Sequence, residues 1–336
     1  MDIFLVFGQN SRRTKNWGEW MHKVIFDTDP GVDDAMALLF LARHPEIDLL
    51  GITTTFGNAS IETTTRNALF LKREWNIDAP VSMGEGQKYL ASGEIYDYPH
   101  YVHGHDGLGN IDVPETIDLP LDPRPAHQFI IDTVRAHPGE VTIIAVGRMT
   151  NLANALHHAP DITGLVKDVV MMGGAFDVPG NVTPAAEANI HGDAAAADAV
   201  FIAPWKVAAI SLDVTLKTVM SRPRLAELAR IGGPEMQLLD RVSQFYIDFY
   251  DGEVENSMVV HDTCACVYVV APDLFTMRPG AVRVQVGGVG EGKTIQKPAG
   301  MRFGPSVWDD QPIQLVSVDV DAAGIMRLVE ETLVRI

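Results

Sequence analysis

The sequence predicts an α/β fold, in which an open, mostly parallel, Rossmann-like sheet carries helices on both faces. Two observations lead to this prediction. From residue 22 onward, short runs rich in β-branched residues alternate with longer segments of helical periodicity, which is typical of parallel strands joined by crossover helices. Polar residues also follow directly after several of the runs, and in open sheets of this kind ligands bind beyond the carboxyl ends of the strands.

The predicted elements alternate along the chain. The predicted strands are short apolar runs at residues 23–26, 49–54, 141–146, 168–172, 207–212 and 313–318. The predicted helices place apolar residues on one face and occupy residues 34–43, 61–75, 125–137, 194–201, 235–250 and 322–335. No internal repeat or low-complexity linker interrupts the series. We therefore expect one domain over residues 21–336, preceded by an extension, residues 1–20, of unassigned role.

The composition favours a protein that works on small molecules. Of the 336 residues, 46% are hydrophobic, which is enough for a sizeable core. The formal charge of -18 would repel a nucleic-acid polymer, because affinity for phosphates depends on Lys and Arg. No segment approaches the ~18 apolar residues of a membrane span, and the apolar run at residues 3–7 is too short for a signal peptide. With only Cys264 and Cys266 as thiols, we expect a cytoplasmic protein without disulfides.

Four aspartates follow the first predicted strand within eight residues: Asp27, Asp29, Asp33 and Asp34. Carboxylates this close raise each other's pKa unless a cation or strong donors offset the repulsion. Oxygen ligands favour Ca²⁺ or Mg²⁺ over Zn²⁺. In the alternative interpretation, Asp27 ends a strand, residues 30–31 form a turn and Asp33 caps the next helix. Capping accounts for one or two of the aspartates, so the spacing favours a metal site.

Segment 27–35, Asp-Thr-Asp-Pro-Gly-Val-Asp-Asp-Ala, resembles the N-terminal fingerprint of the inosine-uridine preferring nucleoside hydrolase family. The resemblance continues through residues 53–58, 146–152, 171–189 and 260–265. It implies the nucleoside hydrolase fold and a calcium-dependent enzyme that hydrolyses the N-glycosidic bond between ribose and a base. It also implies a homodimer or homotetramer that binds a small nucleoside.

The resemblance further implies a Ca²⁺ site and a ribose site that share one pocket. The implied metal ligands are the side chains of Asp29, Asp34 and Asp262 and the main-chain carbonyl of Val146. With a water and two ribose hydroxyls, this set reaches the ~6 to 8 oxygens that calcium prefers. Without the resemblance, the polar loop residues are equally compatible with solvated surface or turns. The implied ribose contacts are Asp33, Asn58, Met172, Asn181, Glu187 and Asn189.

The residues implied at the leaving base are His103, Tyr246, Tyr250 and His261. The tyrosines lie four residues apart and so share a helical face, although core packing explains them about as well. Cleavage of the bond passes through an oxocarbenium-like state. In the implied mechanism Asp29 takes a proton from a metal-activated water, and His261, whose ordinary pKa lies near neutral pH, protonates the base.

Two residues depart from the family pattern, and two other functions compete. Arg148 and Ala188 stand where family members often carry a smaller residue and an aromatic residue, respectively. A haloacid-dehalogenase-like phosphohydrolase also has Asp-x-Asp after its first strand, but it normally has Thr or Val at the position of Gly31. A non-catalytic nucleoside sensor would tolerate replacement of Asp29 and His261, and both are present. We therefore expect a hydrolase of pyrimidine nucleosides, inosine or both.

Overall fold

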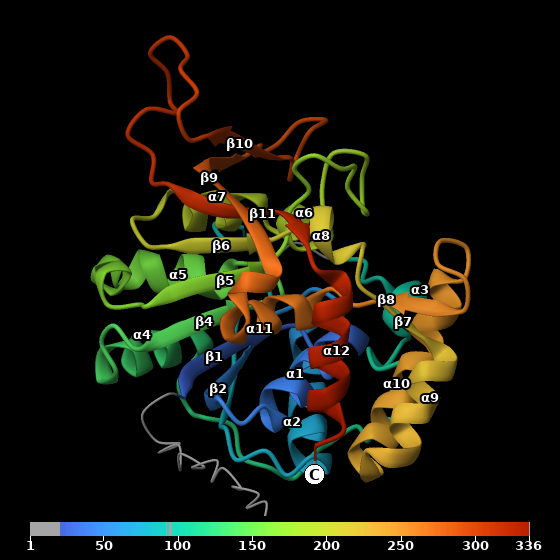
Figure 1. Ribbon diagram of the computed structural model, residues 1–336. Coiled ribbons are helices and arrows are strands. Elements are labelled where there is room, and N and C mark those ends of the chain that lie inside the picture. Colours follow the sequence, from blue (N-terminus) through green and yellow to red (C-terminus); the bar gives the residue numbers. More distant parts are fainter. Residues whose placement is uncertain (1–20, 92, 94–95, 336) are drawn as a thin grey trace, which may run out of the picture.

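The computed structural model describes residues 21–335 except 92, 94 and 95, and it confirms the predicted α/β fold (Figure 1). The predicted extension, residues 1–20, lies outside the described residues. Within the described part, nine strands form one sheet in the order β10-β9-β11-β6-β5-β4-β1-β2-β3, and β7 pairs with β8. The strands are β1 His22–Thr28, β2 Ile47–Thr54, β3 Val81–Met83, β4 Val141–Ala145, β5 Asp168–Met172, β6 Val207–Ile210, β7 Val219–Ser221, β8 Ser257–Val259, β9 Phe275–Val284, β10 Thr294–Pro298 and β11 Gln314–Val320.

Every predicted strand and helix has a counterpart whose ends lie within a few residues of the predicted ones. The sequence did not predict the antiparallel pair β9 and β10, where exposed and buried positions are mixed. None of the helices in the described part is long and apolar enough to cross a membrane. The helices are α1 Val32–Arg43, α2 Ile61–Glu74, α3 His100–His103, α4 Ala126–Ala136, α5 Thr150–His158, α6 Ala188–Gly192, α7 Ala194–Ile202, α8 Leu212–Thr215, α9 Arg222–Ile231, α10 Gly233–Tyr250, α11 Asp262–Val270 and α12 Ala322–Leu333.

The sheet separates two apolar clusters, one on each face. Along β1, Val24 and Phe26 belong to one cluster and Ile25 to the other, because successive side chains of a strand point to opposite faces. The first cluster includes residues of α1, α10, α11 and α12, and the second includes residues of α4, α5 and α7. Figure 1 shows α4 and α5 on one side of the sheet and α1 and α12 on the other.

The carboxyl ends of four neighbouring strands meet at one edge of the sheet. Strand β1 pairs in parallel with β2 on one side and with β4 on the other, and β4 pairs in parallel with β5. In this register Asp27 lies between Thr53 and Ala145. The chain segments that leave β1, β2, β4 and β5 therefore begin side by side, which places the predicted polar residues near one another.

Helix α1 begins two residues earlier than predicted, so Asp33 does not cap it. Gly31 occupies the N-cap position, and the Asp34 carboxylate accepts a hydrogen bond from the Gly31 amide at 3.0 Å. Asp33 and Asp34 consequently lie in the first turn of the helix, where the helix dipole favours negative charge. The prediction that Asp33 caps this helix is therefore wrong, and the capping contact is made by Asp34 instead.

Candidate active site

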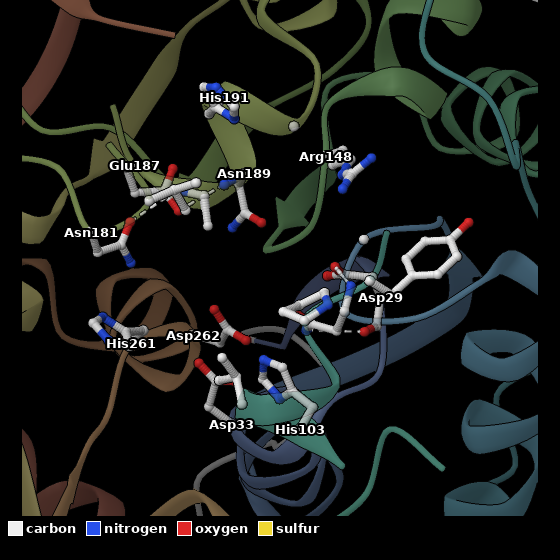
Figure 2. Close-up of a pocket in the computed structure, with 18 of the residues that line it drawn as sticks. Asp29, Asp33, His103, Arg148, Asn181, Glu187, Asn189, His191, His261 and Asp262 are labelled. Atoms are coloured by element: carbon white, nitrogen blue, oxygen red, sulfur yellow. Dashed lines mark hydrogen bonds between the residues drawn. The ribbon is translucent and has the colours of Figure 1, made fainter. Parts of the chain in front are cut away.

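One pocket opens at this edge of the sheet and collects almost all of the predicted site residues. Figure 2 shows Asn181, Glu187 and Asn189 on one side of it, facing Asp33, Asp262 and His103. Asp34 does not line the pocket but lies behind it, hydrogen-bonded to Asn58. The predicted residues that line the pocket are Asp29, Asp33, Asn58, His103, Val146, Met172, Asn181, Glu187, Asn189, Tyr246, Tyr250, His261 and Asp262.

We use the name acidic floor for Asp29, Asp33, Asp34 and Asp262. Carboxylate oxygens of the last three lie within 4.8 Å of one another, and all four side chains are buried. Burial first, and the neighbouring carboxylates second, raise the pKa of Asp33 to about 8 and that of Asp262 well above its ordinary value. Buried carboxyl groups this close are unfavourable as anions unless a cation lies among them.

The main chain around Gly57 and Gly147 holds the Asp29 carboxylate in place, and we call these two residues the glycine seat. A Cβ at Gly57 would lie 1.9 Å from Asp29 Oδ2, and a Cβ at Gly147 would lie 2.6 Å from Oδ1. The Asn58 amide donates to Oδ2 at 2.8 Å, and the Asn58 side-chain amide donates to Asp34 at 2.9 Å. Asn58 therefore links the two aspartates, and glycine is required at 57 and 147 because a side chain would displace the carboxylate.

The oxygen atoms around the floor suit a divalent cation of the alkaline-earth type. Asp29 Oδ1 is buried and has no hydrogen-bond partner among the described residues. Val146 directly follows β4, at the same edge of the sheet as Asp29, and its carbonyl accepts a hydrogen bond from the Asn189 side-chain amide at 2.6 Å. Carboxylate and carbonyl oxygens are the ligands that Ca²⁺ takes. The three-carboxylate cluster contains Asp34 and Asp262 as predicted, includes Asp33, which the sequence assigned to ribose, and does not include Asp29.

The opposite side of the pocket carries the amide and carboxylate groups predicted to bind a sugar. Glu187 caps α6, and its carboxylate accepts from the amides of Gly174, Asn189 and Ile190. The Asn189 side chain donates to the carbonyls of Val146 and Met172, at 2.6 and 3.2 Å. These bonds fix Glu187 and Asn189 in place before any ligand arrives. Asn181 is exposed, and its side chain accepts from the Ala188 amide.

We use the name base wall for His103, Tyr246, Tyr250 and His261, which are all buried. The rings of His103 and Tyr246 stack at 5.3 Å, and those of Tyr246 and Tyr250 meet edge to face at 4.9 Å. Tyr246 and Tyr250 thus share a face of α10 as predicted, and that face lines the pocket. Burial lowers the pKa of His103 to about 3.

The expectation of an ordinary pKa for His261 is wrong. Burial lowers this pKa to about 4, because a charged imidazole loses its hydration inside the protein. Its two ring nitrogens are hydrogen-bonded to hydroxyl groups, Nδ1 to Thr215 at 2.8 Å and Nε2 to Tyr250 at 2.9 Å. The imidazole is therefore neutral at pH 7 in the ligand-free protein.

Several pocket residues were not predicted, or were noted without a role. Arg148 stacks over the Phe56 ring at 4.2 Å, close to Tyr96, and lines the pocket beside Asp29. Phe249 extends the aromatic face of α10 toward the exposed Tyr101. Neither Phe249 nor Tyr101 lies in a recognised motif, although Phe249 falls between the two predicted tyrosines. The two cysteines are buried free thiols, as predicted.

Comparison with known proteins agrees with this geometry. The model of the inosine-uridine preferring nucleoside hydrolase family matches residues 24–327. This chain belongs to that family. As a nucleoside hydrolase it is an enzyme that acts on N-glycosyl bonds, which removes the phosphohydrolase alternative. Its floor and wall residues line one pocket or lie directly behind it.

Individual relatives of this nucleoside hydrolase cover nearly its whole length. It is 37% identical to a probable uridine nucleosidase 2 of Arabidopsis thaliana, over 93% of this chain and 97% of the relative. A solved plant nucleoside hydrolase superposes with a TM-score of 0.87 at 36% identity, over 93% of this chain and 99% of the other. A solved purine-preferring ribonucleoside hydrolase from Gardnerella vaginalis superposes with a TM-score of 0.85 at 30% identity, over 93% of this chain and 98% of the other.

Proposed function

We propose that this nucleoside hydrolase cleaves ribonucleosides, namely pyrimidine nucleosides, inosine or both, to ribose and free base with Ca²⁺ as cofactor. The observation that supports this most directly is the composition of one pocket. It places a carboxylate cluster opposite Glu187 and Asn189, with aromatic and imidazole groups at a third side. A sugar with vicinal hydroxyls needs such amide and carboxylate partners, and an aromatic base needs a flat apolar face.

The floor would hold the cation through Asp29, Asp34, Asp262 and the Val146 carbonyl, with Asp33 beside them. When bound, Ca²⁺ would increase the acidity of the attacking water and neutralise the crowded carboxylates. Asp29 takes the water's proton as general base, because its carboxylate is fixed between Gly57 and Gly147, next to the other carboxylates of the floor. The remaining carboxylates stabilise the positive charge that grows on the ribose.

On the sugar side, Asp33, Asn58, Met172, Asn181, Glu187 and Asn189 surround the ribose. The hydrogen bonds that already hold Glu187 and Asn189 mean that little reorganisation is needed on binding. At the base wall, His261 and Tyr250 face the departing base. Since His261 is neutral, we propose that this pair stabilises the developing negative charge by hydrogen bonding. The base then takes a proton from solvent, and Asp29 returns the water's proton to solvent.

The deciding experiment measures ribose release from uridine, cytidine, inosine and adenosine, before and after the metal is stripped with a chelator and Ca²⁺ or Mg²⁺ is returned. Release that disappears on stripping and returns with Ca²⁺ supports the proposal and ranks the bases. Release that persists without metal overturns the cofactor. Binding of nucleoside with no ribose from any substrate, at any metal concentration, would identify a sensor instead.

We also propose that the chain works as a homo-oligomer. The segment between β10 and β11 extends away from the sheet (Figure 1), and Met301, Phe303, Val307 and Ile313 are exposed there, beside the edge strand β10. Four exposed apolar residues within one short segment favour a contact surface there. Light scattering should show a dimer or tetramer that Phe303→Glu weakens, whereas Ile231→Glu, at an exposed apolar residue on α9, should leave it unchanged. A monomeric unsubstituted protein would contradict the proposal.

A further inference from the structure

Arg148 lines the pocket but has no part in the proposed mechanism. Its guanidinium stacks over Phe56, with Cζ 4.2 Å from the centroid of the ring. A Cβ at Gly192 would lie only 2.4 Å from its Nε, so the main chain at that glycine packs closely against it. An arginine that is stacked and packed in this way has little freedom to move. The guanidinium is therefore fixed in the pocket before any ligand arrives.

The packing leaves a donor of Arg148 without an acceptor. Its Nη1 atom is buried and has no hydrogen-bond partner among the described residues. An arginine is always charged in proteins, and a buried charged donor without an acceptor is costly. Elsewhere in the protein this cost is avoided, since Arg283, which is also partly buried, donates to both oxygens of Asp198 at 2.8 Å. A ligand that carries an acceptor would therefore meet an unsatisfied donor group at Arg148.

Arg148 lies close to the place where the glycosidic bond breaks in the proposed mechanism. The preceding residue, Gly147, belongs to the glycine seat, and a Cβ there would lie 2.6 Å from Asp29 Oδ1. Asp29 and Arg148 both line the pocket, and Figure 2 shows Arg148 across the pocket from His261. Since the water that Asp29 activates attacks C1′ of the ribose, the guanidinium lies near C1′. Arg148 and His261 therefore approach the substrate from opposite sides.

One class of nucleobase carries a strong acceptor next to C1′. In uracil and cytosine the C2 carbonyl is bonded directly to N1, the nitrogen that bears the ribose. In hypoxanthine and adenine no carbonyl is bonded to N9, the corresponding nitrogen. A guanidinium near C1′ can therefore donate to O2 of a pyrimidine, and a hydrogen bond from a charged donor is stronger than one from a neutral donor.

We propose that Arg148 binds the O2 carbonyl of the base and thereby makes the enzyme prefer pyrimidine ribonucleosides. The inference rests on the proposed function and narrows its substrate class. As the bond between C1′ and N1 breaks, its electron pair moves onto the base, and part of this charge lies on O2. The guanidinium, already in position, stabilises that charge without giving up a proton. The water still supplies the hydroxyl group to C1′, and the base still takes its proton from solvent.

The first test compares three substrates. Arg148→Met should lower kcat/KM on uridine about thirtyfold more than on inosine or a nitrophenyl riboside, because only uridine loses a hydrogen bond from a charged donor. Arg148→Lys should recover part of this difference, since it keeps the charge without the planar fork. The matched control is Arg73→Met, because Arg73 also lies over a ring, that of Phe70 at 5.6 Å, but outside the pocket. Equal losses on all three substrates would overturn the inference, because a displaced Asp29 would affect every substrate alike.

A second measurement does not depend on turnover. Pseudouridine has a carbonyl next to the carbon that bears the ribose, whereas formycin B, a purine-like nucleoside, has none there, and both resist hydrolysis because a carbon–carbon bond joins base and sugar. Titration calorimetry should show that Arg148→Met weakens binding of pseudouridine about tenfold and leaves formycin B unchanged. Equal changes for the two ligands, or no change for either, would overturn the inference. Absence of ribose release from every nucleoside would instead overturn the proposed function, and the calorimetric comparison would still stand.

Discussion

The acidic floor and the base wall meet in one pocket, yet the chain builds them in different ways. Asp29 directly follows the end of β1, and Asp33, Asp34 and Asp262 lie in the first turns of α1 and α11. The wall draws on α3, α10 and the residue before α11, which side-chain packing brings together. Asp29, Asp33 and Asp34 are thus placed by local chain geometry, whereas Asp262 and the base wall are placed by tertiary contacts.

The two regions also differ in how well their polar groups are satisfied. The floor crowds buried carboxylates together and leaves Asp29 Oδ1 without a partner among the described residues. In the wall, both nitrogens of His261 already have hydroxyl partners. The floor therefore needs a cation to complete it, whereas the wall is complete before the substrate arrives. Changes to the floor should alter metal binding, and changes to the wall should alter only the fate of the leaving group.

The largest effect is expected from Asp262→Asn on the floor. Turnover of uridine or inosine should fall by roughly three orders of magnitude, because a metal-ligand change removes several kcal/mol of transition-state stabilisation. The metal-free variant should melt at a higher temperature than the metal-free parent, since one repelling carboxyl is gone. Calorimetry with and without Ca²⁺ checks this, with Asp161→Asn, at an exposed aspartate, as the control. A lower melting temperature would show that the floor is stable without a cation.

A smaller loss, about a hundredfold in kcat, should follow Gly57→Ala, because displacing a catalytic group by about 1 Å costs that much. The added Cβ would collide with Asp29 Oδ2. Gly164→Ala is the control, since a Cβ there meets open space. Steady-state kinetics at saturating Ca²⁺ separate the two variants. Equal activity of both would mean that Asp29 has room to move and that the seat does not set its position.

On the wall, His261→Ala should lower turnover of uridine or inosine by roughly 10- to 100-fold and turnover of a nitrophenyl riboside far less. The leaving group of the latter is stable as an anion and needs no help from His261. Isothermal titration should find the Ca²⁺ affinity of this variant unchanged, because the wall is separate from the floor. Equal losses on both substrates would remove His261 from the leaving-group step.

The smallest effect is expected at Asn58, which links Asp29 to Asp34. Asn58→Ala should raise the Kd for Ca²⁺ about tenfold, which is typical when a group that orients metal ligands is lost. The backbone bond from residue 58 to Asp29 remains, so kcat at saturating Ca²⁺ should fall less than in Gly57→Ala. A raised KM for nucleoside at unchanged Ca²⁺ affinity would assign Asn58 to the ribose alone.

The contrast between floor and wall also explains what could be predicted from sequence. The alternating elements and the family motifs are local patterns; they predicted the sheet, and almost all of the site residues that they implied line the pocket. The start of α1 was missed because Gly31 rather than an aspartate occupies the N-cap. The strands β9 and β10 were missed because their burial does not alternate regularly.

Properties that depend on the surroundings of a side chain could not be read from the sequence. The pKa of His261 is lowered by burial, which no local motif reveals. Thr215 lies 46 residues before His261 in the chain and outside every recognised motif, so nothing in the sequence marked it. The position of Arg148 over Phe56 likewise depends on the meeting of two loops.

The glycine seat of Asp29 has a consequence for altering this enzyme. The position of Asp29, the general base of the proposed mechanism, is determined by main-chain atoms just beyond the ends of β2 and β4, at Gly57 and Gly147, and not by residues of the base wall. Substitutions that adapt α10 and its aromatic residues to a new nucleobase should therefore leave the position of Asp29 relative to the attacking water unchanged. A library that varies residues 246–250 and preserves both glycines should change substrate preference without dismantling the chemistry.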